Sequence, residues 1–118
     1  MYNKRSVGSK FEQIAIQYLM ERGYVLIEQN FQCRTGEIDI ITKDKEYLVF
    51  VEVKYRTNAA MGLPQEAIDF RKMRKISRTA QYYMQRNHIP TDTPCRFDVV
   101  IILNQEISLI QDAFEAIL

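Results

Sequence analysis

The sequence predicts an α/β fold in which a central mixed β-sheet is covered by helices on both faces. Helix-like and strand-like segments follow one another in the order α-β-β-β-α-β-β, and the strand-like segments are apolar on both faces. A strand that buries both faces requires a helical layer on each side of its sheet. A length of 118 residues fits one domain. We therefore predict a single unit spanning residues 1–118.

The first predicted helix runs from about Ser9 to Arg22, after an N-terminal tail over residues 1–8. Apolar residues recur in it at helical spacing, and Gly23 provides a stop signal. A strand is predicted over Tyr24–Phe31.

Two β-branched runs, residues 36–42 and 47–55, then surround four polar residues. This pattern predicts a β-hairpin. A loop follows over residues 56–63, and Pro64 suits the first turn of a long helix that ends near Asn87. The remaining elements are a strand over Phe97–Leu103, a second over Ile107–Ile110, and a short helix or tail over Ala113–Leu118.

Composition excludes several classes of protein. The chain has no run of about 18 apolar residues that could form a transmembrane helix. Its polar, basic N-terminus is not followed by the apolar segment of a secretory signal. We expect a cytoplasmic protein with no membrane partner, in which Cys33 and Cys95 are reduced thiols, a disulfide being the alternative. The formal net charge of +1 does not by itself indicate a polyanion-binding domain.

The predicted hairpin carries charged residues inside its apolar runs. By the period of two, Asp39 shares a face of the first strand with Glu37, and Glu52 shares a face of the second with Lys54. A four-residue loop would set Asp39 opposite Glu52, and a two-residue loop would make them diagonal neighbours. A three-residue loop without a bulge would put them on opposite faces.

Two carboxylates that face each other in an apolar sheet repel, and both are costly to desolvate. A divalent cation compensates for this, because Mg²⁺ binds one or two carboxylates and fills its octahedron with waters and substrate phosphate. An ammonium such as that of Lys54 can position a water or neutralise phosphate charge. The hairpin therefore predicts a site for Mg²⁺ or Mn²⁺. The alternative is a solvated hairpin face with cross-strand ion pairs.

The second long helix is basic. Residues 64–90 contain six Lys and Arg against two Asp and Glu, a net +4, so the rest of the chain carries 1 − 4 = −3. A basic helix face suits phosphate contacts, a solvated outer face being the alternative. Lys72 lies off this face and is expected to approach the carboxylates, whereas Arg34 and Arg56 flank them in sequence and suit a scissile phosphate. The residues that share the basic face are Arg71, Arg74, Lys75 and Arg78.

Two sets of residues resemble known families. The segments 37–41 (EIDII) and 48–56 (LVFVEVKYR) resemble the PD-(D/E)xK nuclease superfamily, and in particular its Holliday-junction resolvase-like branch. The segments 30–39, 62–68 and 96–100 resemble the YraN-like family of small bacterial proteins, over most of the chain from about residue 8 to residue 100.

This resemblance implies a restriction-endonuclease-like fold and a Mg²⁺-dependent endonuclease that hydrolyses phosphodiester bonds of DNA, branched or structured. The alternative is a non-catalytic nucleic-acid-binding protein that keeps the fold. By position, the resemblance implies that Asp39, Glu52 and the carbonyl of Val53 bind the metal and that Lys54 is the catalytic lysine. The motif's proline is replaced by Ile38.

Glu12 matches the glutamate in the first helix of the resolvase-like branch, but it also fits a capping box with Ser9 as the N-cap. Both roles stay open. Glu37 is predicted to support the site. Asp98, inside an apolar strand, is either a buried partner for an arginine or a second supporting residue. The likeness to resolvases further implies a homodimer, which no feature of the sequence indicates.

Overall fold

The structure is a computed structural model, and it describes residues 4–56 and 68–117, with the backbone alone over residues 4–8. Its element order confirms the predicted α-β-β-β-α-β-β arrangement around a mixed five-stranded sheet. The elements are α1 (Lys4–Glu21), β1 (Val25–Cys33), β2 (Gly36–Asp44), β3 (Tyr47–Arg56), α2 (Phe70–Arg86), β4 (Cys95–Leu103) and β5 (Glu106–Ile110).

The strands lie in the sheet in their sequence order, from β1 to β5, so β3 is the central strand. β3 pairs antiparallel with β2 and parallel with β4, and the other pairs are antiparallel. The parallel pair needs a crossover. The chain segment that makes it contains α2.

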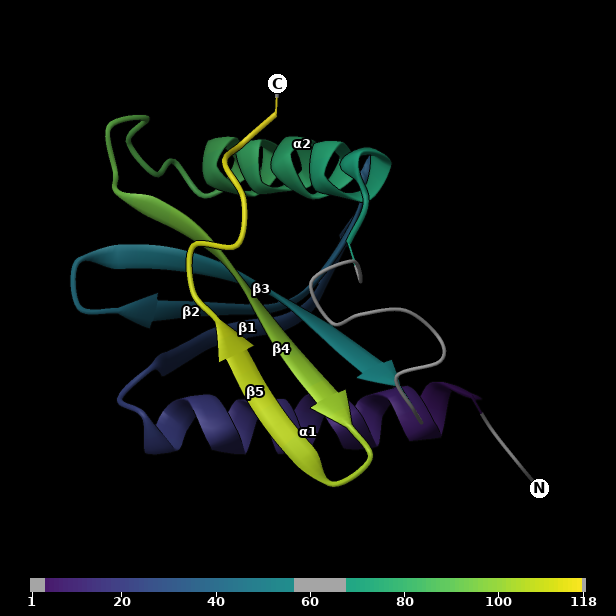
Figure 1. Cartoon of the computed structure of the whole chain (residues 1–118). Coiled ribbons are helices and arrows are strands. Elements are labelled where there is room, and N and C mark those ends of the chain that lie inside the picture. Colours follow the sequence, from purple (N-terminus) through teal and green to yellow (C-terminus); the bar gives the residue numbers. More distant parts are fainter. Residues whose placement is uncertain (1–3, 57–67, 118) are drawn as a thin grey trace.

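The two helices cover opposite faces of the sheet, with α1 on one side and α2 on the other (Figure 1). Side chains of β3 alternate between the two layers: Val49 and Val51 belong to the cluster beneath α1, whereas Leu48 and Phe50 belong to the cluster beneath α2. This alternation explains why the strand is apolar on both faces, as the sequence predicted.

The β2–β3 turn contains only Lys45 and Glu46, because Asp44 pairs with Tyr47. The predicted consequence of such a short turn, a diagonal arrangement of the carboxylates, is wrong. Ile40 pairs with Val51, which is the register predicted for the four-residue loop. Compared with a four-residue loop, the two-residue turn adds the pair Asp44–Tyr47 to the ladder and leaves the register of the two strands unchanged.

Both helices start at different residues from those predicted. α1 begins at Lys4 rather than Ser9, so residues 4–8 of the predicted tail are helical. α2 begins at Phe70 rather than Pro64, because Asp69 is its N-cap and accepts a hydrogen bond from the backbone N–H of Lys72. The predicted loop 56–63 and Pro64 lie outside the described residues, apart from Arg56, which ends β3.

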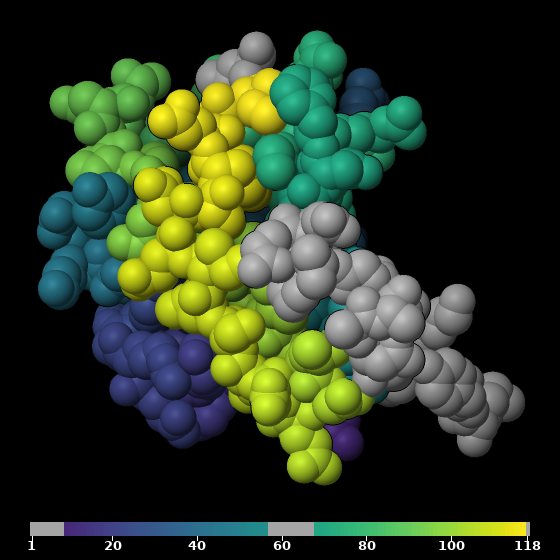
Figure 2. Space-filling view, in the orientation of Figure 1, coloured from purple at the N-terminus to yellow at the C-terminus, as the bar shows by residue number. Residues whose placement is uncertain are grey.

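The C-terminal residues form no helix over 113–117. They run from β5 to α2 and lie against it (Figure 2). The N–H of Ala113 donates to the carbonyl of Phe97 at 2.7 Å, the Phe114 ring stacks on that of Phe97, and the N–H of Ile117 donates to Oγ of Ser77. Among the described residues, neither helix is long and apolar enough to cross a membrane.

Candidate metal and nucleic-acid site

Glu52 is a charged residue inside the central strand. It follows Phe50 on the face beneath α2, and its side chain is only 7% exposed. Oε1 of Glu52 lies 3.8 Å from Nζ of Lys54 and 3.5 Å from Nζ of Lys72. The expectation that Lys72 approaches the carboxylates is confirmed. Two ammonium groups from different elements therefore contact one buried carboxylate oxygen.

Asp39 lies next to Glu52 at the end of the β2–β3 ladder, one residue beyond the last pair, Ile40 and Val51. Oδ2 of Asp39 accepts a 2.8 Å hydrogen bond from the N–H of Val53. This bond ties Asp39 to the strand that carries Glu52 through the N–H of Val53, whereas the resemblance implied a role for the carbonyl of that residue.

The strict alternation of side chains along β2 is broken at Asp39. Ile40 belongs to the cluster beneath α1, but Ile38 and Ile41 both belong to the cluster beneath α2. The predicted shared face of Glu37 and Asp39 assumed unbroken alternation. The break is accompanied by a left-handed backbone at Asn30 on β1, where φ is 55°. It allows Asp39 to interact with acidic groups from more than one layer.

Burial raises the pKa of both carboxylates. Desolvation and the neighbouring charge of Asp39 raise the pKa of Glu52 to about 8, although Lys72 and Lys54 oppose the shift. Desolvation also raises the pKa of Asp39, against the effect of the Val53 N–H. The two acids therefore lie close together, and the positive charge of the neighbouring groups does not fully offset the cost of ionising both of them.

Glu12 extends this acidic cluster from α1. Because α1 begins at Lys4, Ser9 lies inside the helix and is not an N-cap, so the capping-box interpretation of Glu12 is wrong. Oε1 of Glu12 is buried and has no hydrogen-bond partner. Burial and the charges of Asp39 and Glu37 raise the pKa of Glu12 to about 7, with the Asn30 side chain acting in the opposite direction.

Glu37 is exposed and accepts a hydrogen bond from the side chain of Gln32 at 3.2 Å. Its charge contributes to the raised pKa of both Glu12 and Asp39. Glu37 therefore lies near the acidic cluster, on the side of the cluster that faces solvent.

Asp98 belongs to a different cluster, in which it is the buried partner of an arginine. Its fully buried carboxylate accepts hydrogen bonds from Nε and Nη2 of Arg96, from the hydroxyl of Tyr24 and from the N–H of Asp112. Arg96 also contacts Asp44 at 2.8 Å. The structure thus gives Asp98 the first of its two predicted roles.

Apart from Lys72, the predicted phosphate-binding residues form no ion pair with Asp39 or Glu52 in the described part of the chain. Arg71, Arg74, Lys75 and Arg78 are exposed on α2, and Arg34 is exposed in the turn between β1 and β2. The Arg56 guanidinium donates to the carbonyl of Tyr55. Within the described residues, no ion pair links Arg34 or Arg56 to Asp39 or Glu52.

The turn that carries Arg34 is fixed to α2. Oγ1 of Thr35 hydrogen bonds to Oγ1 of Thr79 at 3.1 Å, and a Cβ at Gly36 would lie 3.1 Å from the same atom. Gly36 also has a φ of +150°, which L side chains rarely adopt. The sequence-based reading did not identify the Thr35–Thr79 contact or the interaction of Asn30 with Glu12, although Asn30 and Thr35 both lie in the segment 30–39 that carries the family resemblance.

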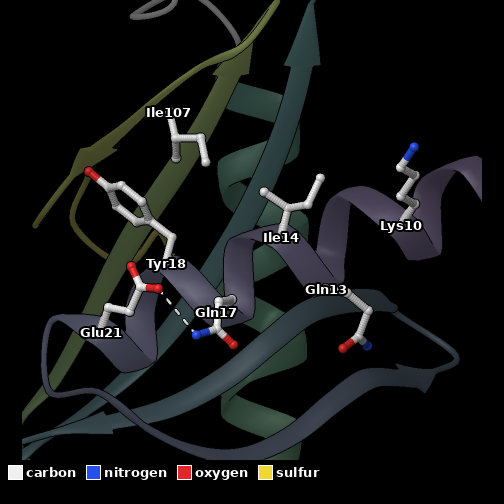
Figure 3. Close-up of a pocket in the computed structure, with 7 residues that line it drawn as sticks. All are labelled: Lys10, Gln13, Ile14, Gln17, Tyr18, Glu21 and Ile107. Carbon is white, nitrogen blue, oxygen red and sulfur yellow. Dashed lines mark hydrogen bonds between the residues drawn. The ribbon is translucent and has the colours of Figure 1, made fainter.

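A separate shallow pocket lies on the outer flank of α1 (Figure 3). Ile14 and Tyr18 face it with Ile107 of β5, and Gln17 donates a hydrogen bond to Glu21 at 3.2 Å. Asp39, Glu52 and Glu12 do not line this pocket, so it is not part of the candidate site.

No three His, Cys, Asp or Glu side chains in the described part of the chain are grouped as a complete metal-ligand set. Asp39 and Glu52 would therefore act as a pair with the Val53 carbonyl. Mg²⁺ accepts such a set, since it is commonly bound through one or two carboxylates and completed by water. Cys33 and Cys95 are both free thiols, as expected.

A sequence model described as "Uncharacterised protein family UPF0102" matches residues 11–102, a range that includes every residue of the acidic cluster and both lysines. The chain belongs to the UPF0102 family. A UPF0102 protein of Lachnoclostridium phytofermentans is 53% identical over 114 residues, which cover 97% of each chain. A UPF0102 protein of Clostridium botulinum strain Hall is 43% identical over 120 residues, covering 97% of this chain and 98% of that one. These matches confirm the YraN-like family membership predicted from the motifs.

Proposed function

We propose that this UPF0102 protein is a nuclease that uses Mg²⁺ or Mn²⁺ to hydrolyse phosphodiester bonds of DNA, and that it has the restriction-endonuclease-like fold of the PD-(D/E)xK superfamily. The observation that carries the proposal is the position of Glu52. It is buried in the central strand, beside Asp39 and within 3.8 Å of two lysine ammonium groups.

The residues present fit a divalent cation. The raised pKa of Glu52 and of Asp39 shows that nearby positive charge does not fully stabilise their ionised forms. One carboxylate oxygen of Glu12 is also buried without a partner. Asp39, Glu52 and the carbonyl of Val53 would hold the ion, which would act as a Lewis acid on a phosphoryl oxygen and lower the pKa of a bound water.

The side chains of the site have separate roles in this proposal. Lys54 orients the attacking water or neutralises the developing charge on the phosphate, because it shares the face of Glu52 and is partly exposed. Arg34, Arg56 and the basic face of α2 bind the phosphates on either side of the scissile bond. Branched or structured DNA is the substrate class implied by the resolvase-like motif, and a homodimer is the corresponding assembly.

The test is cleavage of labelled DNA in Mg²⁺ or Mn²⁺. Duplex, single-stranded, flapped and four-way substrates should be compared with the same substrates in RNA. The parent protein should cut at least one DNA substrate, and Asp39→Ala and Lys54→Ala should not. Calorimetric titration of Mn²⁺ into the parent and into Asp39→Ala checks the metal site independently. Equal, negligible binding to both would remove the metal site and the mechanism with it.

One observation favours a second candidate, a nucleic-acid-binding protein that does not cleave. The ammonium of Lys72 lies 3.5 Å from Glu52 and supplies positive charge at the carboxylate without a metal. In that case the parent would show salt-dependent DNA binding that survives Asp39→Ala and Glu52→Ala, and no substrate would be cut.

A further inference from the structure

Lys72 connects the basic helix to the acidic cluster. Its Nζ lies 3.5 Å from Oε1 of Glu52, closer than that of Lys54 at 3.8 Å, although Lys54 is on the same strand as Glu52. The side chain of Lys72 is 36% exposed, compared with 21% for Lys54 and 7% for Glu52. Of the two cations at this carboxylate, Lys72 is the one with more access to solvent.

The backbone of Lys72 is held by the cap of α2. Its N–H donates a 2.8 Å hydrogen bond to Oδ1 of Asp69, the N-cap of α2. A capped first turn holds the Cα of Lys72 in place. Any movement of its ammonium is therefore a rotation of a flexible four-carbon side chain, which requires no displacement of the helix.

The position of Lys72 on α2 places it between two sets of charges. Arg71 and Lys75, one before it and three after it, are exposed residues of the basic face. The ammonium of Lys72 instead points to the buried carboxylates, at the margin of that face. A rotation away from Glu52 would bring the ammonium closer to the basic face, where nucleic-acid phosphates would be bound.

We propose that Lys72 is an exchangeable internal cation of the site. It pairs with Glu52 when no metal is bound, and it leaves Glu52 for a phosphate of the nucleic acid when a divalent cation is held there. This inference rests on the proposed function. The expected exchange is electrostatic. A divalent cation bound to Glu52 would repel the ammonium of Lys72, which lies 3.5 Å from an oxygen of the same carboxylate.

The exchange couples two binding events. Glu52 must lose Lys72 before it binds a cation fully, and Lys72 must leave Glu52 before it pairs with a phosphate. Each event therefore favours the other, and the coupling must be the same in both directions. An ion pair that merely anchors α2 on the sheet would show no such coupling.

The first test measures Mg²⁺ affinity by calorimetry for the parent, Lys72→Met and Lys75→Met, at an alkaline pH where protons compete least for Glu52. Lys75→Met is the matched control, because it removes the same charge from an exposed position of the same helix. Lys72→Met should bind Mg²⁺ roughly fivefold or more tightly than the parent, the lower end of typical coupling effects. Lys75→Met should stay within about twofold of the parent, as expected for a screened, more distant charge. Equal or weaker binding by Lys72→Met overturns the exchange.

The second test uses the parent protein and does not depend on the folding of a variant. With ¹³C-labelled lysine, the Cε signal of Lys72 should shift as Mg²⁺ saturates the parent protein. The signal of Lys75 should shift less. A Lys72 signal that stays unchanged at saturating Mg²⁺ overturns the exchange even if the variants do not fold.

The two proposals fail in different ways. If Mg²⁺ does not bind to the parent or to either variant, the metal site of the proposed function and the exchange are both contradicted. If Mg²⁺ binds in a manner that Asp39→Asn abolishes, but Lys72→Met leaves its affinity unchanged, the proposed function stands and only the exchange is overturned.

Discussion

The N–H of Val53 lies 2.8 Å from Oδ2 of Asp39 and donates a hydrogen bond to it. The bond joins β2 to β3 just beyond their last paired residues, Ile40 and Val51. It holds the Asp39 carboxylate next to Glu52 before any ligand arrives. A site whose groups are already positioned loses less entropy on binding.

Two substitutions at Asp39 separate this hydrogen bond from the negative charge. Asp39→Asn removes the charge and keeps an oxygen acceptor for Val53, whereas Asp39→Ala removes both. We expect Asp39→Ala to be less stable than Asp39→Asn by about 1–3 kcal/mol, the cost of an unpaired buried donor. Urea denaturation measures the difference, and both variants should lose Mn²⁺ binding. Equal stability of the two variants would show that the hydrogen bond contributes nothing.

Stability should fall as the pH rises through neutrality. The pKa of Glu52 is raised from 4.5 to about 8, so between these values the folded state holds a proton that the unfolded state has lost. Because the folded state then binds more protons, the free energy of unfolding decreases with increasing pH across this window, and the penalty is complete above pH 8. The pKa of Glu12, raised to about 7, acts in the same direction.

Glu52→Gln tests this pH dependence, because it removes the titrating group and keeps the side-chain volume. Between pH 5 and pH 9 we expect the parent to lose roughly 2–4 kcal/mol through Glu52, since each pKa unit corresponds to about 1.4 kcal/mol. The variant should lose correspondingly less. Denaturation curves at several pH values, without metal, measure the difference. Parallel pH profiles for the two proteins would contradict the shifted pKa.

Tyr24→Phe should destabilise the fold and leave the candidate site intact. The Tyr24 hydroxyl donates to Asp98 at 2.7 Å and accepts hydrogen bonds from Arg96 and Gln111. Its loss removes a hydrogen bond to the buried Asp98 carboxylate, which keeps Arg96 and the N–H of Asp112 as donors, and should cost about 1–3 kcal/mol. Tyr82→Phe, at an exposed tyrosine, is the matched control and should change stability by less than about 0.5 kcal/mol. Mn²⁺ affinity should be the same in both, and a loss confined to Tyr24→Phe would place this cluster in the site after all.

The basic face of α2 should determine the salt dependence of DNA binding. Arg74→Ala and Arg78→Ala, combined, should weaken binding for all sequences and reduce the slope of log affinity against log salt by about 2, one for each lost phosphate contact. Fluorescence anisotropy without divalent metal measures both quantities. Lys45→Ala, at an exposed residue of the β2–β3 turn, is the control. An equal effect from Lys45→Ala would show that only net charge matters.

The sheet is well predicted from the sequence because burial of a strand requires apolar residues at regular positions along it. The alternation of Leu48, Val49, Phe50 and Val51 between two cores can be read directly from their apolar character. The start of α2 is also marked in the sequence, since Asp69 directly precedes Phe70, where the apolar helical pattern begins, and this is a normal N-cap signal. Proline at position 64 also favours a first helical turn, but the described helix begins after the Asp69 cap.

The candidate site was harder to predict because it depends on departures from regular structure. The break in alternation at Asp39 accompanies a left-handed backbone at Asn30 on the neighbouring strand, which no local period reveals. The role of Asp98 was ambiguous because Arg96 lies on its own strand, whereas Tyr24 and Gln111 are distant in sequence. The approach of Lys72 was predictable because it lies off the basic face of its helix.

The central place of β3 also has a kinetic consequence. Glu52 and Val53 lie on a strand that is paired with β4 along almost its whole length and with β2 up to Val51, so releasing their backbone requires β3 to separate from β4. We expect the amide protons of β3 to be among the slowest in the protein to exchange with solvent, and those of the edge strand β5 to exchange much faster. The candidate site is therefore built on the stretch of backbone that is least able to adapt. Adjustment of the site to a ligand must therefore come from side-chain movements rather than from the backbone of β3.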